Sequence, residues 1–281
     1  MTHVVGILHQ PRLPDTEAKA REICAWLAAQ GVDSWMGSTW DEDDVNGNLP
    51  RLTLLVVLGG DGSTLRAARL AVPHDVPIFG INMGRVGFLS EAQLDNWQLK
   101  LEKVLRGEFW LERRLMLRAR LERNGRVDGT FTALNDVVVG RGRQARVLRL
   151  QLLVDGDHVT QYTADALIVA TPTGSTAYSM AAGGPLLPPQ LQNFVVVPVA
   201  AHLSLDRSLV LHEEAEITIQ VQMDHEATLM ADGQEGIFLA DGDKIIVSKH
   251  DRYCSFARVE PAGYFYRRLM RRLGHARLQN E

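Results

Sequence analysis

The sequence lacks the features of a secreted, membrane-spanning or nucleic-acid-binding protein. Its only two cysteines, Cys24 and Cys254, lie far apart in apolar surroundings, which predicts buried thiols in a reducing compartment. No apolar run approaches the ~20 residues of a membrane span, and the N-terminus has no basic leader. A formal net charge of −4 argues against nucleic acid as the main partner. We therefore expect a cytoplasmic protein that binds neither nucleic acid nor a membrane.

Two common phosphate-binding patterns are also missing. The most prominent glycine turn is not G-x-G-x-x-G, and no G-x-x-x-x-G-K-[ST] occurs. The histidines are scattered, so no protein-made metal site is predicted. What is present is a chain of 281 residues, 46% hydrophobic and 23% charged, which is typical of a globular protein with one large domain or two modest ones.

The first hundred residues alternate between apolar runs and helical patterns. Strands are expected at residues 3–8, 32–35, 54–58 and 77–81, and helices at 14–30, after 63, and at 95–106 with Leu99, Val104 and Leu105 in the core. Such alternation predicts an α/β domain with an open parallel sheet and helices on its faces. The acidic run at residues 41–44 is interpreted as a solvated loop, because one local run does not enclose a cation.

From residue 109 the pattern changes to many short strands, the last at residues 255–259, with turn signals such as Asn124-Gly125 and Asp155-Gly156. This predicts an all-β second domain over residues 109–261, after an α/β domain over residues 1–108. Residues 262–281 return to a helix with interleaved arginines. We expect it to dock on the first domain with its arginines in solvent, in preference to lying on a membrane surface.

The stretch from residue 54 to residue 69 organises the chain. A buried strand is followed by Gly59, Gly60 and Gly62, and then by a helix that Ser63 or Thr64 can cap. Backbone N–H groups and a helix N-terminus make such a turn an anion site. Asp61 in its centre would repel a phosphate, which favours a role as general base or metal contact. The simpler alternative is that Asp61 only caps the helix.

Three other patches bear polar groups beside apolar strands. Asn135-Asp136 has the simple interpretation of a turn or sheet edge. Residues 171–185 combine hydroxyls, glycines and small side chains, and Tyr178 offers a flat face to a base. Asp232-Gly233-Gln234 is best interpreted, from the sequence alone, as a bare hairpin loop.

Taken together, these motifs resemble the NAD kinase family from the first strand to the last helix. The first motif alone is shared with diacylglycerol and sphingosine kinases, whereas its combination with residues 80–89 and 171–185 is specific. The resemblance implies a Rossmann-like N-terminal domain, a C-terminal β-sandwich and a site in the crevice between them. It also implies phosphoryl transfer from ATP to the adenosine 2′-hydroxyl of NAD, with Mg²⁺ or another divalent cation, in a homodimer or homotetramer.

The resemblance also assigns roles to residues of this sequence. It places the proton acceptor on Asp61. It places substrate contacts on Asp61, Gly62, Arg66, Asn135, Asp136, Arg146, Asp165, Thr176, Ala177, Tyr178, Ser179, Met180, Ala181 and Gln234. Two departures from the family pattern are Ser63, where many members have Thr, and Ala166, where Gly is usual. Two other functions remain open at this point: a lipid kinase with the same use of Asp61, and a dinucleotide sensor without catalysis.

Overall fold

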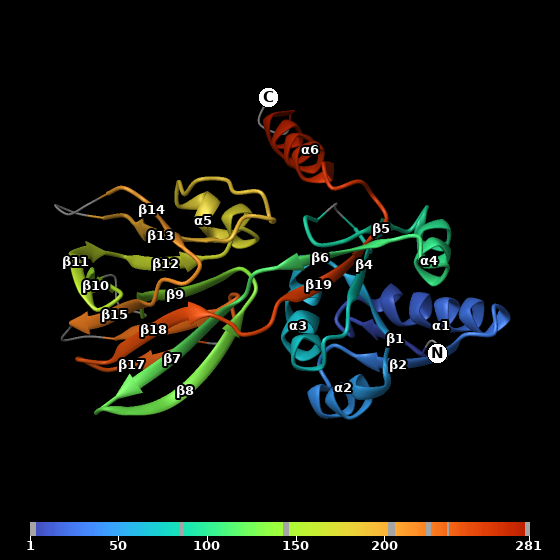
Figure 1. The fold of residues 1–281 in the computed structure, drawn as a ribbon, viewed down its shortest axis with the longest axis horizontal. Coiled ribbons are helices and arrows are strands. Elements are labelled where there is room, and N and C mark those ends of the chain that lie inside the picture. Colours follow the sequence, from blue (N-terminus) through green and yellow to red (C-terminus); the bar gives the residue numbers. More distant parts are fainter. Residues whose placement is uncertain are drawn as a thin grey trace. The chain divides into compact units, whose positions relative to one another are not determined.

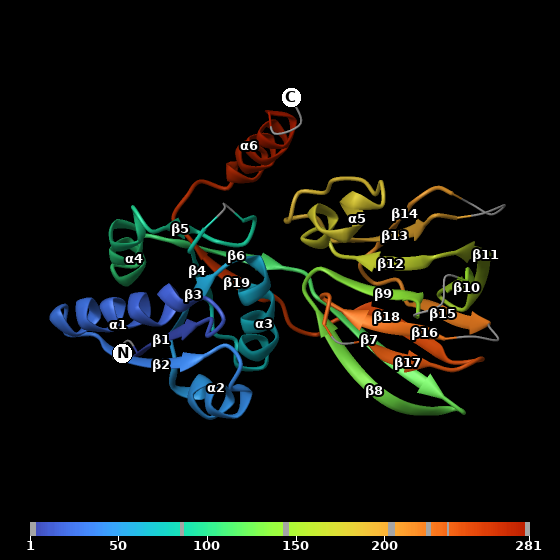
Figure 2. The same cartoon turned by 180° about the vertical axis from the view of Figure 1, so that it is seen from behind.

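The computed structural model describes residues 4–84, 87–142, 146–201, 206–222, 226–234 and 236–278. The chain forms two compact units, the first made of Met1–Arg113 with Cys254–Glu281 and the second of Arg114–Tyr253 (Figures 1 and 2). These boundaries differ from the sequence-based ones, which assign residues 109–113 and 254–261 to the all-β domain. No helix in the described part of the chain is long and apolar enough to cross a membrane.

The first unit is built on a parallel sheet. Its strands are β1 (Val4–His9), β2 (Asp33–Ser38), β3 (Leu54–Gly59), β4 (Ile78–Asn82), β5 (Ala92–Gln93), β6 (Trp110–Arg114) and β19 (Cys254–Arg258). They run in the order β2-β1-β3-β4-β19-β6, with β5 beside β4. The pairings of β1 with β2 and β3, and of β4 with β3, β5 and β19, are all parallel. The open parallel sheet predicted from the sequence is therefore confirmed.

Helices cover both faces of this sheet (Figure 1). They are α1 (Pro14–Ala29), α2 (Glu42–Asn48), α3 (Asp61–Ala71) and α4 (Trp97–Leu105), with 3-10 turns η1 (Leu49–Arg51) and η2 (Val72–His74). Ile23 and Leu27 of α1 share a core with Trp97 and Leu101 of α4. Leu99 is 60% exposed, so its predicted core position was wrong, because Leu101 and Val104 occupy the face of α4 that is turned to the sheet.

The acidic run does not form the loop that the sequence predicts. Residues 42–44 begin helix α2, and the carboxylate of Asp41 accepts a hydrogen bond from the N–H of Asp44 at 3.1 Å. Acidic side chains are stabilising in the first turn of a helix, where the dipole is positive. The run is therefore a helix start, a possibility that its charge alone does not reveal.

The second unit is a sandwich of antiparallel sheets. One sheet has the order β11-β10-β15-β18-β7-β8 and the other β14-β13-β12-β9-β16-β17. The strands are β7 (Leu117–Arg123), β8 (Arg126–Ala133), β9 (Asp136–Arg141), β10 (Leu148–Val154), β11 (Asp157–Ala164), β12 (Ala166–Ala170), β13 (Asn193–Val199), β14 (Leu209–His212), β15 (Ile217–Gln222), β16 (Ala227–Ala231), β17 (Ile237–Leu239) and β18 (Lys244–Lys249). After β12 come η3 (Gly174–Thr176) and α5 (Tyr178–Ala181). Alternate side chains of both sheets form one apolar core, as expected for a β-sandwich.

Helix α6 (Tyr264–Leu278) belongs to the first unit and docks on it as predicted. Phe265 and Leu269 are buried against Phe88. The expectation that all its arginines lie in solvent was wrong for Arg268, whose side chain is only 11% exposed and pairs with Glu91 and Glu260.

Both cysteines are thiols outside any disulfide, as the sequence predicts. Cys254 is buried, whereas Cys24 is partly exposed, so burial is confirmed for only one of them. Cys24 lies on α1, a helix with one face on the sheet and the other in solvent, which explains its partial exposure.

Candidate active site

The glycine turn joins β3 directly to α3, and Asp61 is the first residue of that helix. The N-cap residue is Gly60, and no side chain caps the helix. Ser63 and Thr64 were predicted as caps, but both lie within the first turn, where their N–H groups bond to the Gly60 carbonyl. Since no side chain among the described residues caps this N-terminus, its positive end is suited to an anion.

The carboxylate of Asp61 is held by backbone amides from a distant part of the chain. Its Oδ2 accepts the N–H of Phe88 and its Oδ1 accepts the N–H of Leu89, both at 3.0 Å. Hydrogen bonds from amides to a carboxylate are charge-assisted and fix its orientation. From the sequence, Asp61 was expected to lie among the backbone amides of its own glycine turn. Nothing in the sequence indicated that the amides of Phe88 and Leu89 would bind its carboxylate.

Gly87 is a test of how closely the Asp61 carboxylate must be held. A Cβ at this position would lie 2.1 Å from Asp61 Oδ1 and 2.9 Å from Oδ2. Because the obstructing atoms end a side chain, Gly87→Ala should turn the carboxylate away and leave the fold nearly intact. We expect turnover to fall roughly 10- to 100-fold, as misplacement of a reacting group does, with little change in melting temperature.

The matched control for this prediction is Gly84→Ala on the same connection. A Cβ at Gly84 meets no atom within 4 Å. The control should therefore keep the turnover of the parent protein in a steady-state assay. Equal turnover of Gly87→Ala and the parent would contradict a need for a fixed Asp61 carboxylate.

Arg66 lies one turn along α3, beside an aromatic ring that sequence analysis missed. Its guanidinium carbon is 4.1 Å from the ring centroid of Trp40, and that of Arg12 is 3.9 Å from the same centroid. Arg66 also pairs with Glu42 at 3.5 Å. These residues follow β1, β2 and β3, so they gather at the carboxyl edge of the sheet, where ligands bind in open α/β folds. The position of Trp40 just after a predicted strand was the available signal.

Asp232 organises the corresponding polar cluster of the second unit. Its carboxylate accepts the N–H groups of Leu134, Asn135 and Asp136 at 2.7–3.2 Å. The interpretation of residues 232–234 as a bare hairpin loop was therefore wrong. A turn motif reports its local backbone, and it does not report a partner that lies 97 residues away.

Residues 171–185 begin at this cluster. The Thr171 hydroxyl donates to the Leu134 carbonyl at 2.6 Å, and the Thr171 N–H donates to the Asn135 carbonyl at 2.9 Å. The hydroxyls of Ser175 and Thr176 also donate to backbone carbonyls. Most of these hydroxyls therefore hold the loop in shape, while the Tyr178 side chain is 44% exposed. Ser179 differs, because its buried hydroxyl has no partner among the described residues.

Asp136 is a buried acid in this cluster, at the start of β9 and 5% exposed. Burial, and then the negative charge of Asp232, raise the pKa of its carboxyl to about 7. Within the described part of the chain, no donor contacts this carboxylate. A hydrogen-bond donor on a ligand would satisfy it.

The raised pKa of Asp136 predicts a pH dependence of stability. Between pH 4 and pH 7 the unfolded chain has lost this proton and the folded chain still holds it, so stability falls as pH rises. The loss reaches a few kcal/mol at most and is complete above the folded-state pKa. Asp136→Asn does not titrate, so its stability relative to the parent should rise across this range. Urea unfolding from pH 4.5 to 8 measures the free energy of unfolding of both proteins. If the two free energies changed with pH in parallel, the raised pKa of Asp136 would be refuted.

Comparison with known proteins identifies the family. The ATP-NAD kinase N-terminal domain matches residues 50–109, and the ATP-NAD kinase C-terminal domain matches residues 134–259. The chain belongs to the NAD kinase family. It is 40% identical to the NAD kinase of Chloroflexus aggregans over 97% of this chain and 99% of that protein, and 38% identical to that of Syntrophotalea carbinolica over 96% and 98%.

Solved structures in the NAD kinase family have the same fold. An NAD kinase from Archaeoglobus fulgidus in complex with ATP is 28% identical, with a TM-score of 0.75 over 92% of this chain and 95% of that one. Yeast NADH kinase complexed with NADH gives a TM-score of 0.82 over 98% and 88%, and at 23% identity it supports the fold alone.

The remaining residues carried over from the NAD kinase family do not all lie together. Gln234 is in the turn that contains Asp232. Asp165 precedes β12, whereas Asn135 lies near its other end, because β12 pairs Ala170 with Asp136. Asp165 pairs with Arg141 at 3.2 Å, and Arg146 is exposed before β10. In the described part of the chain, no group of three His, Cys, Asp or Glu side chains is placed to hold a metal.

Proposed function

We propose that this protein transfers the γ-phosphoryl group of ATP to the 2′-hydroxyl of the adenosine ribose of NAD, giving NADP and ADP. The new bond joins the ribose oxygen to phosphorus, and the bond to the β-phosphate bridging oxygen breaks. Asp61 accepts the hydroxyl proton. The observation that supports this role best is the pair of amides that fix both oxygens of Asp61 beside an uncapped helix N-terminus.

The first unit supplies groups for the triphosphate. Phosphoryl transfer depends mainly on positioning and on stabilisation of charge. The N-terminal amides of α3, with Gly62 in its first turn, are suited to phosphate oxygens, and Arg66 adds a positive charge one turn further on. The stacking of Arg66 on Trp40 restricts where its guanidinium lies.

The second unit supplies groups for the dinucleotide. We assign to Asp136 the ribose hydroxyls, whose protons satisfy its buried carboxylate, and to Asn135 the adenosine. Tyr178 is exposed and offers its ring to a base. We assign further substrate contacts to Thr176, Ala177, Ser179, Met180, Ala181 and Gln234.

The residues present suit Mg²⁺ bound mainly through substrate. Mg²⁺ is usually held by one or two carboxylates and by phosphate oxygens, and not by an all-protein cage. Asp61 is the carboxylate at the turn, and the described residues hold no separate metal cluster. When bound, the ion would offset the charge of the triphosphate.

A homo-oligomer is part of the proposal. Arg146 and Asp165 are assigned to dinucleotide binding, yet Asp165 is separated from the Asn135 cluster by the length of β12. Five strand residues span about 16 Å, which exceeds the reach of the Asp165 side chain. We therefore propose that Arg146 and Asp165 serve the dinucleotide bound by a second copy of the chain. Sedimentation equilibrium tests this, and a monomer at assay concentrations would refute it.

The test of the activity is direct. The purified protein is incubated with Mg²⁺, ATP and NAD, and NADP is measured by a cycling assay. Parallel reactions replace NAD by NADH, ATP by another triphosphate or polyphosphate, and the dinucleotide by diacylglycerol. Formation of NADP with equal release of ADP supports the proposal. Transfer to the lipid, or dinucleotide binding without transfer, would overturn it.

A further inference from the structure

Residues 88–91 lie between Asp61 and helix α6, and both sides of this backbone are bonded. Toward the turn, the N–H groups of Phe88 and Leu89 hold the Asp61 carboxylate. On the other side, Arg258 Nη1 donates to the carbonyls of Leu89 at 3.1 Å and Ser90 at 3.2 Å. Arg268 of α6 donates to the same Ser90 carbonyl.

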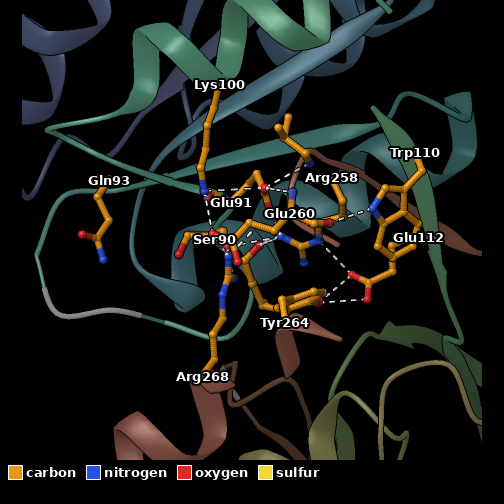
Figure 3. A network of polar contacts seen from close by, with 12 residues as sticks. Ser90, Glu91, Gln93, Lys100, Trp110, Glu112, Arg258, Glu260, Tyr264 and Arg268 are labelled. Atoms are coloured by element: carbon orange, nitrogen blue, oxygen red, sulfur yellow. Dashed lines mark hydrogen bonds and ion pairs between the residues drawn. The ribbon is translucent and has the colours of Figure 1, made fainter. Parts of the chain in front are cut away.

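The arginine that holds this backbone is itself fixed by buried acids (Figure 3). Arg258 is fully buried and pairs with Glu112 at 2.9 Å and with Glu91 at 3.4 Å. Tyr264, at the start of α6, donates its hydroxyl to Glu112 at 2.9 Å. Glu91 also accepts the N–H groups of residues 259 and 260 at 3.0 and 2.8 Å.

Buried charges of this kind require an explanation other than stability. Removing two ions from water costs about as much as their attraction returns, and apolar substitutes are often as stable. What the ions provide here is orientation, since one planar guanidinium bonds two successive carbonyls and two carboxylates. The peptide groups that it orients, 89–90 and 90–91, directly follow the ones that donate to Asp61, 87–88 and 88–89.

Helix α6 adds a second hold on the same residues. Phe265 packs on Phe88 with ring centroids 6.4 Å apart. Arg268 reaches Ser90 and pairs with Glu91 at 3.6 Å, while Lys100 bonds the Glu91 carbonyl at 2.7 Å. We propose that Arg258, Arg268 and Tyr264 are positioning residues for phosphoryl transfer. They hold the backbone of residues 88–91, so that the amides in this segment keep the Asp61 carboxylate in the orientation that the reaction requires. This inference rests on the proposed role of Asp61.

The experiment compares two neighbouring arginines of α6. Arg267 is exposed and has no ion pair among the described residues, whereas Arg268 holds Ser90. Arg268→Met should lower kcat roughly tenfold, because the Asp61 carboxylate loses its orientation. The KM values for ATP and NAD should stay within about twofold of those of the parent, because substrate binding is kept. Arg267→Met should match the parent. Arg268→Lys, which retains a donor, should recover part of the loss.

A double variant separates positioning from general loss of structure. If the arginine acts through Asp61, adding Arg268→Met to Asp61→Asn should lower the residual turnover no further. If Arg268→Met lowered turnover by the same factor in Asp61→Asn as in the parent, the proposal would be overturned. Equal kcat values for Arg268→Met and Arg267→Met would also overturn it. The proposed function fails separately, if Asp61→Asn alone keeps the turnover of the parent.

Tyr264→Phe tests the same positioning role with a smaller change, in case the arginine variants misfold. It removes one hydroxyl from Glu112 and keeps the volume of the ring. It should reduce kcat in the same direction by a smaller factor, at unchanged KM and with an unchanged circular dichroism spectrum. Parent-like kcat for both Tyr264→Phe and a folded Arg268→Met would refute a positioning role for α6.

Discussion

Asp61→Asn is expected to lower turnover by 10²- to 10⁴-fold while NAD binding is largely kept. A general base typically contributes a factor of this size. The structure adds a second reason for the loss. The carboxylate accepts the N–H of Phe88 on Oδ2 and the N–H of Leu89 on Oδ1. An amide has only one acceptor oxygen, so its NH₂ group would face one of these donors and the side chain would turn.

Asp75→Asn is the matched control, because it makes the same chemical change at an exposed position of the first unit. Asp75 has a φ of 55°, a conformation that asparagine also tolerates. The control should keep the parent kcat, and isothermal titration should show NAD affinity within about threefold for both variants. If Asp61→Asn turned over NAD at the parent rate, Asp61 would not be the base.

The sequence was sufficient for features that depend on local burial and local backbone. The continuous apolar run at residues 54–58 predicts a strand covered on both faces, and β3 is fully buried. Asn124-Gly125 and Asp155-Gly156 each predict a hairpin, and all four residues have positive φ.

The sequence was insufficient where the outcome depends on a distant partner. Residues 255–259 have the pattern of a strand, but nothing local indicates that β19 pairs in parallel with β4 through Phe256 and Ile78. Asp232 is a second example, since its turn gives no sign of the amides of residues 134–136. Arg258 is a third, because its charge predicts exposure and its burial depends on Glu91 and Glu112.

Gly174→Ala is expected to reduce kcat/KM for NAD by roughly 100-fold, with most of the loss in KM. A Cβ at Gly174 would lie 2.0 Å from the Asn135 carbonyl oxygen and 2.5 Å from its carbon. Both are backbone atoms that Thr171 and Asp232 hold in place, so the clash cannot be relieved by a side chain. The Asn135 peptide must move, and with it the groups assigned to adenosine and ribose.

The same clash should also lower the free energy of unfolding by about 1–3 kcal/mol, which is the usual cost of overpacking a well-packed site. Gly140→Ala is the control, since its Cβ would lie 3.5 Å from Ala166 Cβ, an ordinary contact in the same sheet. Initial rates over a range of NAD concentrations and thermal melts of both variants measure the two effects. Parent-like KM for NAD in Gly174→Ala would show that the backbone at Asn135 does not position the dinucleotide. A lower melting temperature of Gly174→Ala with an unchanged kcat/KM for NAD would show that Gly174 has only a structural role.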